Sequence, residues 1–147
     1  MKKIETKPKK AKTIKAALKL LRTVRRGSGG WHDALRKLRI LVLDALKNAE
    51  NEKRCMKVLA SIPISVYDGE FRGAAVARML LLNTFNAYKC SYIIAKAGSG
   101  SERRALEGMF ATAHTVEELE TVVRLAPDAT RCKNEARARI EKIRQRL

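Results

Sequence analysis

The 147-residue sequence has few of the residues that would identify a disulfide-rich protein or a metal site. Its three cysteines, Cys55, Cys90 and Cys132, are an odd number and lie far apart in the chain. This spacing gives no disulfide framework and no CxxC pair, so we expect reduced, buried thiols in a reducing, intracellular compartment. His32 and His114 are equally isolated, and we therefore expect no zinc or other metal site.

We expect neither a secretory signal nor a membrane partner. The first apolar cluster is interrupted by lysines, which is not typical of a signal peptide. The basic, amphipathic stretch 6–32 leaves a mitochondrial presequence as a weaker alternative, since such presequences prefer Arg and this region is rich in Lys. A spanning helix needs about 20 predominantly apolar residues. The longest apolar stretch is instead interrupted by Arg78, Asn83, Asn86 and Lys89.

Arrangements that carry catalysis are also missing from the sequence. Cys90 lies within an apolar stretch, and His114 directly precedes a predicted helix start, so no base stands beside a nucleophile. The glycine-rich segment 27–30 is not a phosphate-binding P-loop, because no strand precedes it and no Gly-Lys-Ser/Thr follows. We therefore expect a protein that is not an enzyme and has no cofactor.

Proline and glycine are scarce, with three and eight residues, and no stretch alternates apolar and polar residues for long. Together with many Ala, Leu, Lys, Arg and Glu, this composition predicts an all-α fold. A hydrophobic content of 46% excludes a wholly disordered chain. We predict a disordered, mobile basic tail at 1–12 and a single helical domain at 13–147, a compact bundle of about six to seven helices.

The longest apolar segment, Gly73 to Ala97, predicts the helix around which the others pack. It contains no proline and no internal glycine, and most helical directions carry apolar side chains. Arg78, Lys89 and Lys96 fall on one narrow line at 100° per residue. A helix that is apolar over most of its circumference is buried, so we expect one long central helix here.

Local signals place the ends of the other helices. A basic helix at 13–26 is predicted to end at a flexible hinge, 27–30, and a short extended segment is predicted at 64–67. Thr115 and Glu118 have the spacing of a capping box. The side chains expected to cap helix N-termini are Thr13, Asp68, Ser101, Thr115 and Asp128.

Acidic residues are the scarcest charged class, with 15 Asp and Glu against 32 Lys and Arg, which gives a net charge of +17. Residues 1–32 hold eleven basic residues and one acid, and residues 131–147 hold seven basic residues and two acids. The long middle, 33–130, is nearly neutral, with fourteen basic residues and twelve acids. Basic charge segregated at two ends indicates an anionic partner.

The predicted helix at 13–26 carries a continuous basic ridge. Lys15, Lys19, Arg22 and Arg26 follow one another at intervals of four, three and four residues, which places them on one helix face. Solvated lysines on an amphipathic helix need no ligand. The region from Thr6 to His32 contains no acid, however, whereas a solvated helix normally intersperses Glu to relieve repulsion. This absence favours a phosphate-binding face.

The leading hypothesis is a non-enzymatic nucleic-acid-binding protein that holds phosphate backbones through its basic ends, in a packaging, ribosome-associated or regulatory role. The sequence contains no RNP, KH, zinc-finger or helix-turn-helix signature and no set of base-reading side chains, so we expect weak preference for sequence and no choice between DNA and RNA. The candidate phosphate-binding residues are Lys9, Lys10, Lys12, Lys15, Lys19, Arg22, Arg25, Arg26, Arg36, Arg137, Arg139 and Arg144.

An alternative function follows from the last predicted helix. Its apolar residues recur at intervals of three and four, as in the seam of a coiled coil. This seam either packs on the core of its own chain or joins a partner helix. The alternative is therefore a helical interaction module that binds an acidic protein or a partner helix, or that self-associates. The seam residues are Ala136, Ile140, Ile143 and Leu147.

Overall fold

A computed structural model describes residues 13–67 and 69–147, and this part of the chain is all-α and contains no strand. The prediction of the fold class is confirmed, with eight α-helices in the described ranges rather than six or seven. The predicted tail and the predicted N-cap Asp68 lie outside the described residues. The helices are α1 (Ile14–Thr23), α2 (Gly29–Lys47), α3 (Glu52–Ala60), η1 (Ile64–Val66, a 3₁₀ turn), α4 (Gly69–Leu82), α5 (Phe85–Ile94), α6 (Gly100–Thr112), α7 (Val116–Leu125) and α8 (Arg131–Gln145).

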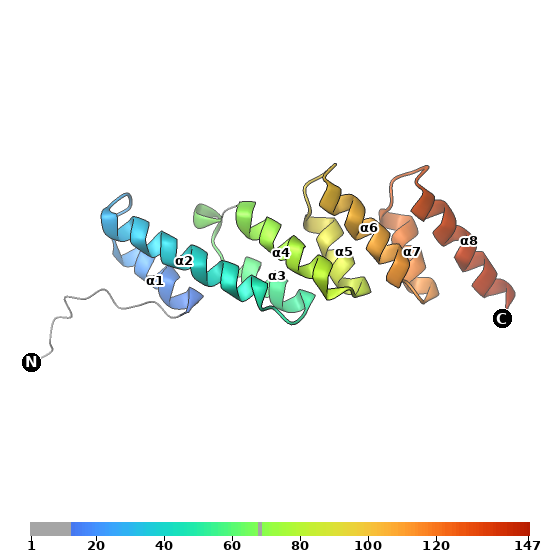
Figure 1. Cartoon of the computed structure of the whole chain (residues 1–147), viewed down its shortest axis with the longest axis horizontal. Helices are drawn as coiled ribbons and strands as arrows, with labels where there is room; N and C mark the ends of the chain where they lie inside the picture. The colour runs from blue at the N-terminus through green and yellow to red at the C-terminus, as the bar shows by residue number, and fades with distance from the viewer. Residues whose placement is uncertain (1–12, 68) are drawn as a thin grey trace, which may run out of the picture.

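The helices form four antiparallel hairpins that stand side by side in a row, α1–α2, α3–α4, α5–α6 and α7–α8 (Figure 1). The even-numbered helices make one layer, in which α2 contacts α4, α4 contacts α6, and α6 contacts α8. The odd-numbered helices lie behind them (Figure 1). Each hairpin therefore packs against its neighbours in the row, and α1 and α8 lie at opposite ends.

The prediction of one long helix over 73–97 is wrong, because the chain reverses direction between α4 and α5. Asn83 has a φ of 54°, a left-handed conformation that Asn tolerates better than most residues. The Thr84 side chain then accepts a hydrogen bond from the amide of Ala87 at 3.2 Å and caps α5. The two apolar halves thus fold against each other as neighbouring helices.

The first of these halves, α4, keeps the central position that its apolar character predicts. It contacts α2, α3, α5 and α6, and five of its side chains are buried: Phe71, Ala75, Val76, Met79 and Leu80. One apolar cluster joins α1–α4 to α5, and a second joins α5 to α6–α8. A small third cluster, which includes Val76 and Ala105, connects them. Among the helices of the described ranges, none has both the length and the apolarity to cross a membrane.

Side-chain caps start most of the helices, although not always at the predicted residue. Thr13 and Thr115 cap α1 and α7 as expected, and Thr115 forms a full capping box with Glu118. Ser99, not Ser101, caps α6, so α6 begins two residues earlier. Asp128 caps nothing, because α8 begins at Arg131 after Thr130.

Two loop predictions are also corrected. The basic helix ends at Thr23, three residues before the predicted end at 26, and α2 already begins at Gly29. In the predicted hinge 27–30, only Gly27 has a positive φ, 83°, while Ser28 caps α2. The predicted extended segment 64–67 contains the single turn η1.

Candidate nucleic-acid interface

Helix α1 presents the predicted basic ridge to solvent. Its apolar side buries Ala17 and Leu21 against α2, and this contact fixes the rotation of the helix. Lys15, Lys19 and Arg22 project from another side and are exposed. The structure therefore places these three predicted residues on one accessible helix face.

The turn between α1 and α2 carries two further predicted cations, Arg25 and Arg26, and both are exposed. The carbonyl oxygen of Arg25 accepts hydrogen bonds from the amide of Ser28, at 3.0 Å, and from its hydroxyl, at 2.6 Å. The Ser28 hydroxyl in turn accepts from the amide of Trp31 at 3.2 Å. These bonds tie the turn to the start of α2, so the two arginines are held at the end of the first hairpin.

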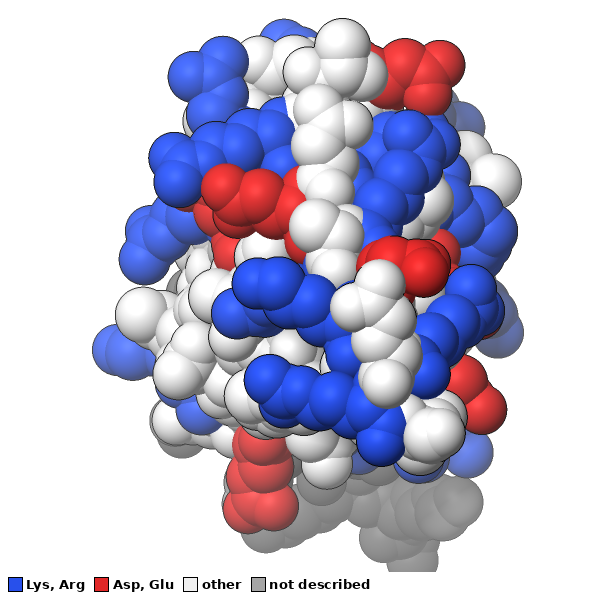
Figure 2. All heavy atoms as spheres, turned by 90° about the vertical axis from the view of Figure 1, so that its right-hand side faces the viewer, with Lys and Arg blue, Asp and Glu red and all other residues white. Residues whose placement is uncertain are grey.

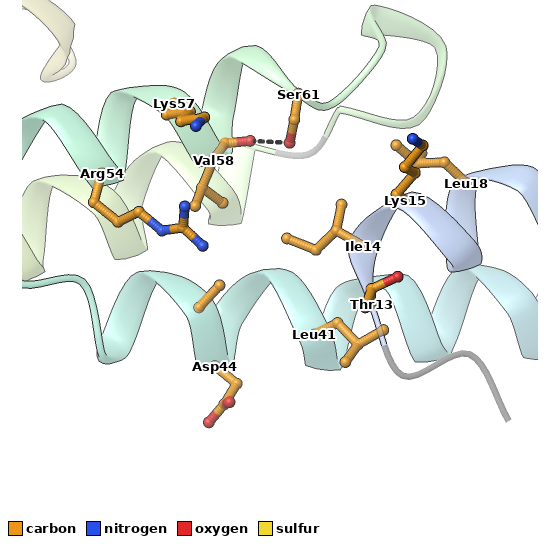
Figure 3. Close-up of a pocket in the computed structure, with 11 residues that line it drawn as sticks. Thr13, Ile14, Lys15, Leu18, Leu41, Asp44, Arg54, Lys57, Val58 and Ser61 are labelled. Carbon is orange, nitrogen blue, oxygen red and sulfur yellow. Dashed lines mark hydrogen bonds between the residues drawn. The ribbon is translucent and has the colours of Figure 1, made fainter.

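A groove of about 570 Å³ runs between α1, α2 and α3 beside the ridge. Its apolar lining comes from Ile14, Leu18, Leu41, Ala45 and Val58. Its charged lining residues are Lys15 from α1, Asp44 from α2, and Arg54 and Lys57 from α3. Figure 3 shows the guanidinium of Arg54 extending between α2 and α3, whereas the Asp44 carboxylate points away from the space. The groove is thus flanked by cations from two helices.

The contribution of α3 to this surface is absent from the sequence-based prediction. Lys53, Arg54 and Lys57 are exposed, and a second hollow of about 470 Å³ that shares Arg54 and Lys57 with the groove is also lined by Lys53. Their segment also contains Glu50 and Glu52, so its charge is balanced in the sequence. The spacing from Lys53 to Lys57, one turn of helix, is the signal that could have identified it.

Eight exposed cations of α1, of the turn after it and of α3 have no acidic partners in the part of the chain that the structure describes. None of them has a carboxylate oxygen within the 4.0 Å limit for an ion pair. Close, unpaired cations repel one another, and an anionic ligand relieves that repulsion. We name this set the N-terminal basic surface, and its members are Lys15, Lys19, Arg22, Arg25, Arg26, Lys53, Arg54 and Lys57.

The predicted residues of the C-terminal end are in a different electrostatic environment. Arg144 donates to Glu120 of α7 at 2.9 Å, and the guanidinium of Arg139 lies 4.8 Å from the ring centroid of Phe110. Arg137 is exposed without an acidic partner in the described ranges. Figure 2 shows this end of the molecule, where Lys and Arg lie on both sides of an uncharged strip with acidic side chains among them.

Other cations of α8 are neutralised locally. The side chain of Arg131 pairs with Glu135 at 2.6 Å, and Lys133 pairs with Asp128. The remaining predicted residue, Arg36 on α2, lies 3.5 Å from Asp33. The structure therefore does not bring all the predicted cations together: the two basic ends lie at opposite ends of the row (Figure 1). The predicted Lys9, Lys10 and Lys12 lie outside the described residues.

The predicted partner-helix seam packs within its own chain. Ala136 and Ile140 are buried in the cluster of α6–α8, and Ile143 packs against that cluster. Only Leu147 is free, with 99% of its surface exposed. Packing on α6 and α7 thus covers Ala136 and Ile140, so these two seam residues are not exposed to a partner helix.

The remaining reactive side chains are isolated or buried. Burial raises the pKa of the Cys55 thiol above its ordinary value. The pKa values of Cys90 and Cys132 are also raised, and burial is again the largest cause. All three are free thiols, and no cluster of His, Cys, Asp and Glu that could hold a metal ion occurs in the described ranges. Comparison of the chain with models of known protein families, with curated protein sequences and with solved structures gives no match.

Proposed function

We propose that the protein is a non-enzymatic nucleic-acid-binding protein that holds the phosphate backbone along its N-terminal basic surface. The observation that carries this proposal is the set of unpaired cations on both sides of the α1–α3 groove. Lysine and arginine neutralise phosphates and release condensed counterions, which gives an affinity that grows with the number of contacts. The cations of the N-terminal basic surface are not bound to carboxylates of the described residues. A phosphate can therefore contact them without displacing an intramolecular partner.

The lining of the groove supports sequence-independent binding. Its uncharged surface is aliphatic or hydroxyl-bearing and includes no aromatic ring and no Asn or Gln side chain among the described residues. Aromatic rings stack on unpaired bases, and amide side chains recognise adenine edges. A ligand in this groove is therefore held through its backbone, and we expect similar affinities for unrelated sequences.

In this proposal, the C-terminal helix has the smaller role. Arg144, Arg131 and Lys133 already contact carboxylates, so a phosphate at those positions must compete with an intramolecular partner. Exposed ion pairs of this kind contribute about 0–1 kcal/mol each, so the competition is weak for one contact and adds up over several. The N-terminal basic surface should therefore supply most of the affinity.

Two matched triple variants test this division. One changes Lys15, Lys19 and Lys57 to Gln, and the other changes Arg137, Lys142 and Arg146 of α8 to Gln. Each removes three exposed cations that lack an acidic partner in the described ranges. Anisotropy of a fluorescein-labelled 20-nucleotide single strand and of its duplex, at low salt, gives the dissociation constants.

We expect the N-terminal triple variant to bind at least tenfold more weakly than the wild type. The C-terminal triple variant should lose less than threefold, because the hollow that Arg137 lines is also lined by Glu120 and Glu141, whose charge opposes phosphate binding. The circular dichroism of both variants should match that of the wild type, because none of the six side chains is buried. Equal losses in the two variants, or no binding of either probe by the wild type, would sink the proposal.

A further inference from the structure

A second groove lies between α3 and α5, on the opposite flank of α3 from the N-terminal basic surface. Its volume is about 530 Å³, and its apolar lining includes Met56, Leu59, Tyr67, Ile93 and Ile94. The side chain of Ile93 is 60% exposed, although Ile is among the residues most often buried. The exposed Ile93 and the half-buried aliphatic side chains beside it form an apolar surface that an apolar side chain of another polypeptide can cover.

The charged residue among the described residues that line this α3–α5 groove is basic. Arg72 of α4 lines it, and a neighbouring hollow of about 430 Å³ shares Arg72 and Ala95 with it and adds Lys96. No Asp or Glu occurs among the described residues that line the two hollows. Neither Arg72 nor Lys96 forms an ion pair with another described residue. An incoming ligand with carboxylates would thus find two unpaired cations beside an apolar floor.

These properties distinguish between the possible occupants. A second copy of this chain is disfavoured, since two molecules of net charge +17 repel each other. A nucleic acid would leave polar base and sugar groups against aliphatic side chains without hydrogen-bond partners, which is costly. A polypeptide can bury Leu, Ile or Phe in the groove while its Asp and Glu side chains reach the cations at the edge.

We propose that the α3–α5 groove binds an acidic, apolar polypeptide segment of a partner protein. The helical geometry of α3 separates this site from the phosphate-binding surface: Arg54 and Lys57 line the groove beside α1, whereas Met56 and Leu59 line the groove beside α5. The two ligands therefore do not compete for the same side chains. The protein can hold a nucleic acid and a partner protein at the same time.

A library of random 12-residue peptides displayed on phage provides the test, with the full-length wild-type protein as bait. We expect the enriched peptides to combine at least two large apolar residues with at least two Asp or Glu. The most enriched peptide, synthesised with a fluorescein label, is then titrated with the wild type and with single variants.

The informative variants are Ile93→Glu and Arg72→Glu, and the matched control is Ile40→Glu. Ile40 lies on α2 and is 62% exposed, which is nearly the exposure of Ile93, so both substitutions add the same charge at equally accessible isoleucines. We expect Ile93→Glu and Arg72→Glu to weaken peptide binding at least tenfold, and Ile40→Glu to change it less than twofold.

Three results would overturn this inference: enriched peptides without the combination of apolar and acidic residues, unchanged binding by Ile93→Glu, or an equal loss in Ile40→Glu. Binding of the 20-nucleotide strand by Ile93→Glu is measured in parallel and should stay within twofold of the wild type. Failure of the peptide site is thereby distinguished from failure of nucleic-acid binding.

Discussion

Gly108 of α6 and Tyr88 of α5 show how closely two helices of this row approach each other. A Cβ atom placed on Gly108 would lie 2.3 Å from Cε1 of the Tyr88 ring. The ring has little freedom to move away, because the Tyr88 hydroxyl donates a hydrogen bond of 2.8 Å to Oδ1 of Asn83. Only a residue without a side chain fits at position 108 in this arrangement.

We therefore predict that Gly108→Ala lowers the free energy of unfolding by about 1–3 kcal/mol, the usual cost of overpacking. The control is Gly73→Ala in α4, where an added Cβ has no neighbour within 4 Å. That substitution should raise the free energy of unfolding by about 0.5–1 kcal/mol, because Ala is the better helix former. Urea denaturation measures both, and equal effects of the two substitutions would contradict the packing of α5 on α6.

Glu118 contributes a stability that depends on pH. Its carboxylate accepts hydrogen bonds from the amides of His114, at 2.9 Å, and Thr115, at 3.2 Å. The bond from His114 is the main cause that lowers the pKa of Glu118 in the folded chain. A lowered pKa in the folded state means that the stabilisation is complete above the unfolded pKa, about 4.3, and is lost as the pH falls through the folded pKa.

Glu118→Gln should accordingly lower the melting temperature at pH 7 by a few degrees, since a cap is worth about 1 kcal/mol. At pH 3, which is below the unfolded pKa, protonation of the Glu118 carboxylate begins to remove its hydrogen bonds from the wild type as well, so the difference between the two proteins should become smaller. Melting followed by circular dichroism at both pH values measures this. A difference of the same size at pH 7 and pH 3 would exclude a role for the charged carboxylate.

The three thiols should react slowly in the native protein. Burial is the largest cause of the raised pKa of each cysteine, so the fraction of reactive thiolate at pH 8 is smaller than in an unfolded chain. We predict at least tenfold slower reaction with Ellman's reagent in buffer than in urea, with Cys55, which is wholly buried, the slowest. Rapid native reaction of Cys55 would show that the packing of α3 is looser than described.

At the scale of the helix, the break at Asn83 is the largest difference between the sequence-based prediction and the structure. A left-handed residue favours Gly or Asn and disfavours β-branched residues by roughly 1–2 kcal/mol. Asn83→Val should therefore destabilise the protein by more than Asn83→Gly, as measured by urea denaturation. One continuous helix over 73–97 would give the opposite order, because Val is a better helix former than Gly.

The positions of many helices follow from local sequence signals. The predictions about helix ends that are wrong have local and tertiary causes. Capping by Thr13 and Thr115 is predictable because each side chain acts on its own helix. The reversal at Asn83 is hidden because apolar residues continue on both sides of it, and hydrophobicity alone does not distinguish two consecutive apolar helices from one. Ser99, rather than the predicted Ser101, caps helix α6, which begins at Gly100.

The candidate interface was predictable in part. The part of the ridge that lies on α1, Lys15, Lys19 and Arg22, is visible in the sequence because these residues share one helix face and no acid interrupts them, whereas Arg26 lies in the turn after the helix. The ion pair between Arg144 and Glu120 joins residues of two helices. Arg54 lies beside α1 only because the first two hairpins pack together. Such relations between distant segments are set by tertiary structure and leave no periodic signal in the sequence.

At the scale of the whole molecule, the two basic ends have different physical roles. Helix α8 closes the row of hairpins, and a terminal repeat needs a polar outer face to remain in contact with water. Its many charges, several of them paired, meet that need without a ligand. The N-terminal basic surface lies at the other end of the row, which also needs a polar outer face, but its cations have no carboxylate partner among the described residues.

The dependence of binding on salt tests this account most directly. The dissociation constants of the wild type and of the variant with Lys15, Lys19 and Lys57 changed to Gln are measured for the 20-nucleotide strand and its duplex between 50 and 300 mM KCl. Each phosphate contact adds about 0.7 to the slope of log affinity against log salt for a single strand and about 0.9 for a duplex. We predict that the slope of log affinity against log salt is smaller in magnitude by roughly 2 for this variant than for the wild type. For the matched α8 variant, the slope should be smaller by less than about 1. Equal slopes for the wild type and the N-terminal variant would contradict the claim that the α1–α3 surface binds phosphate.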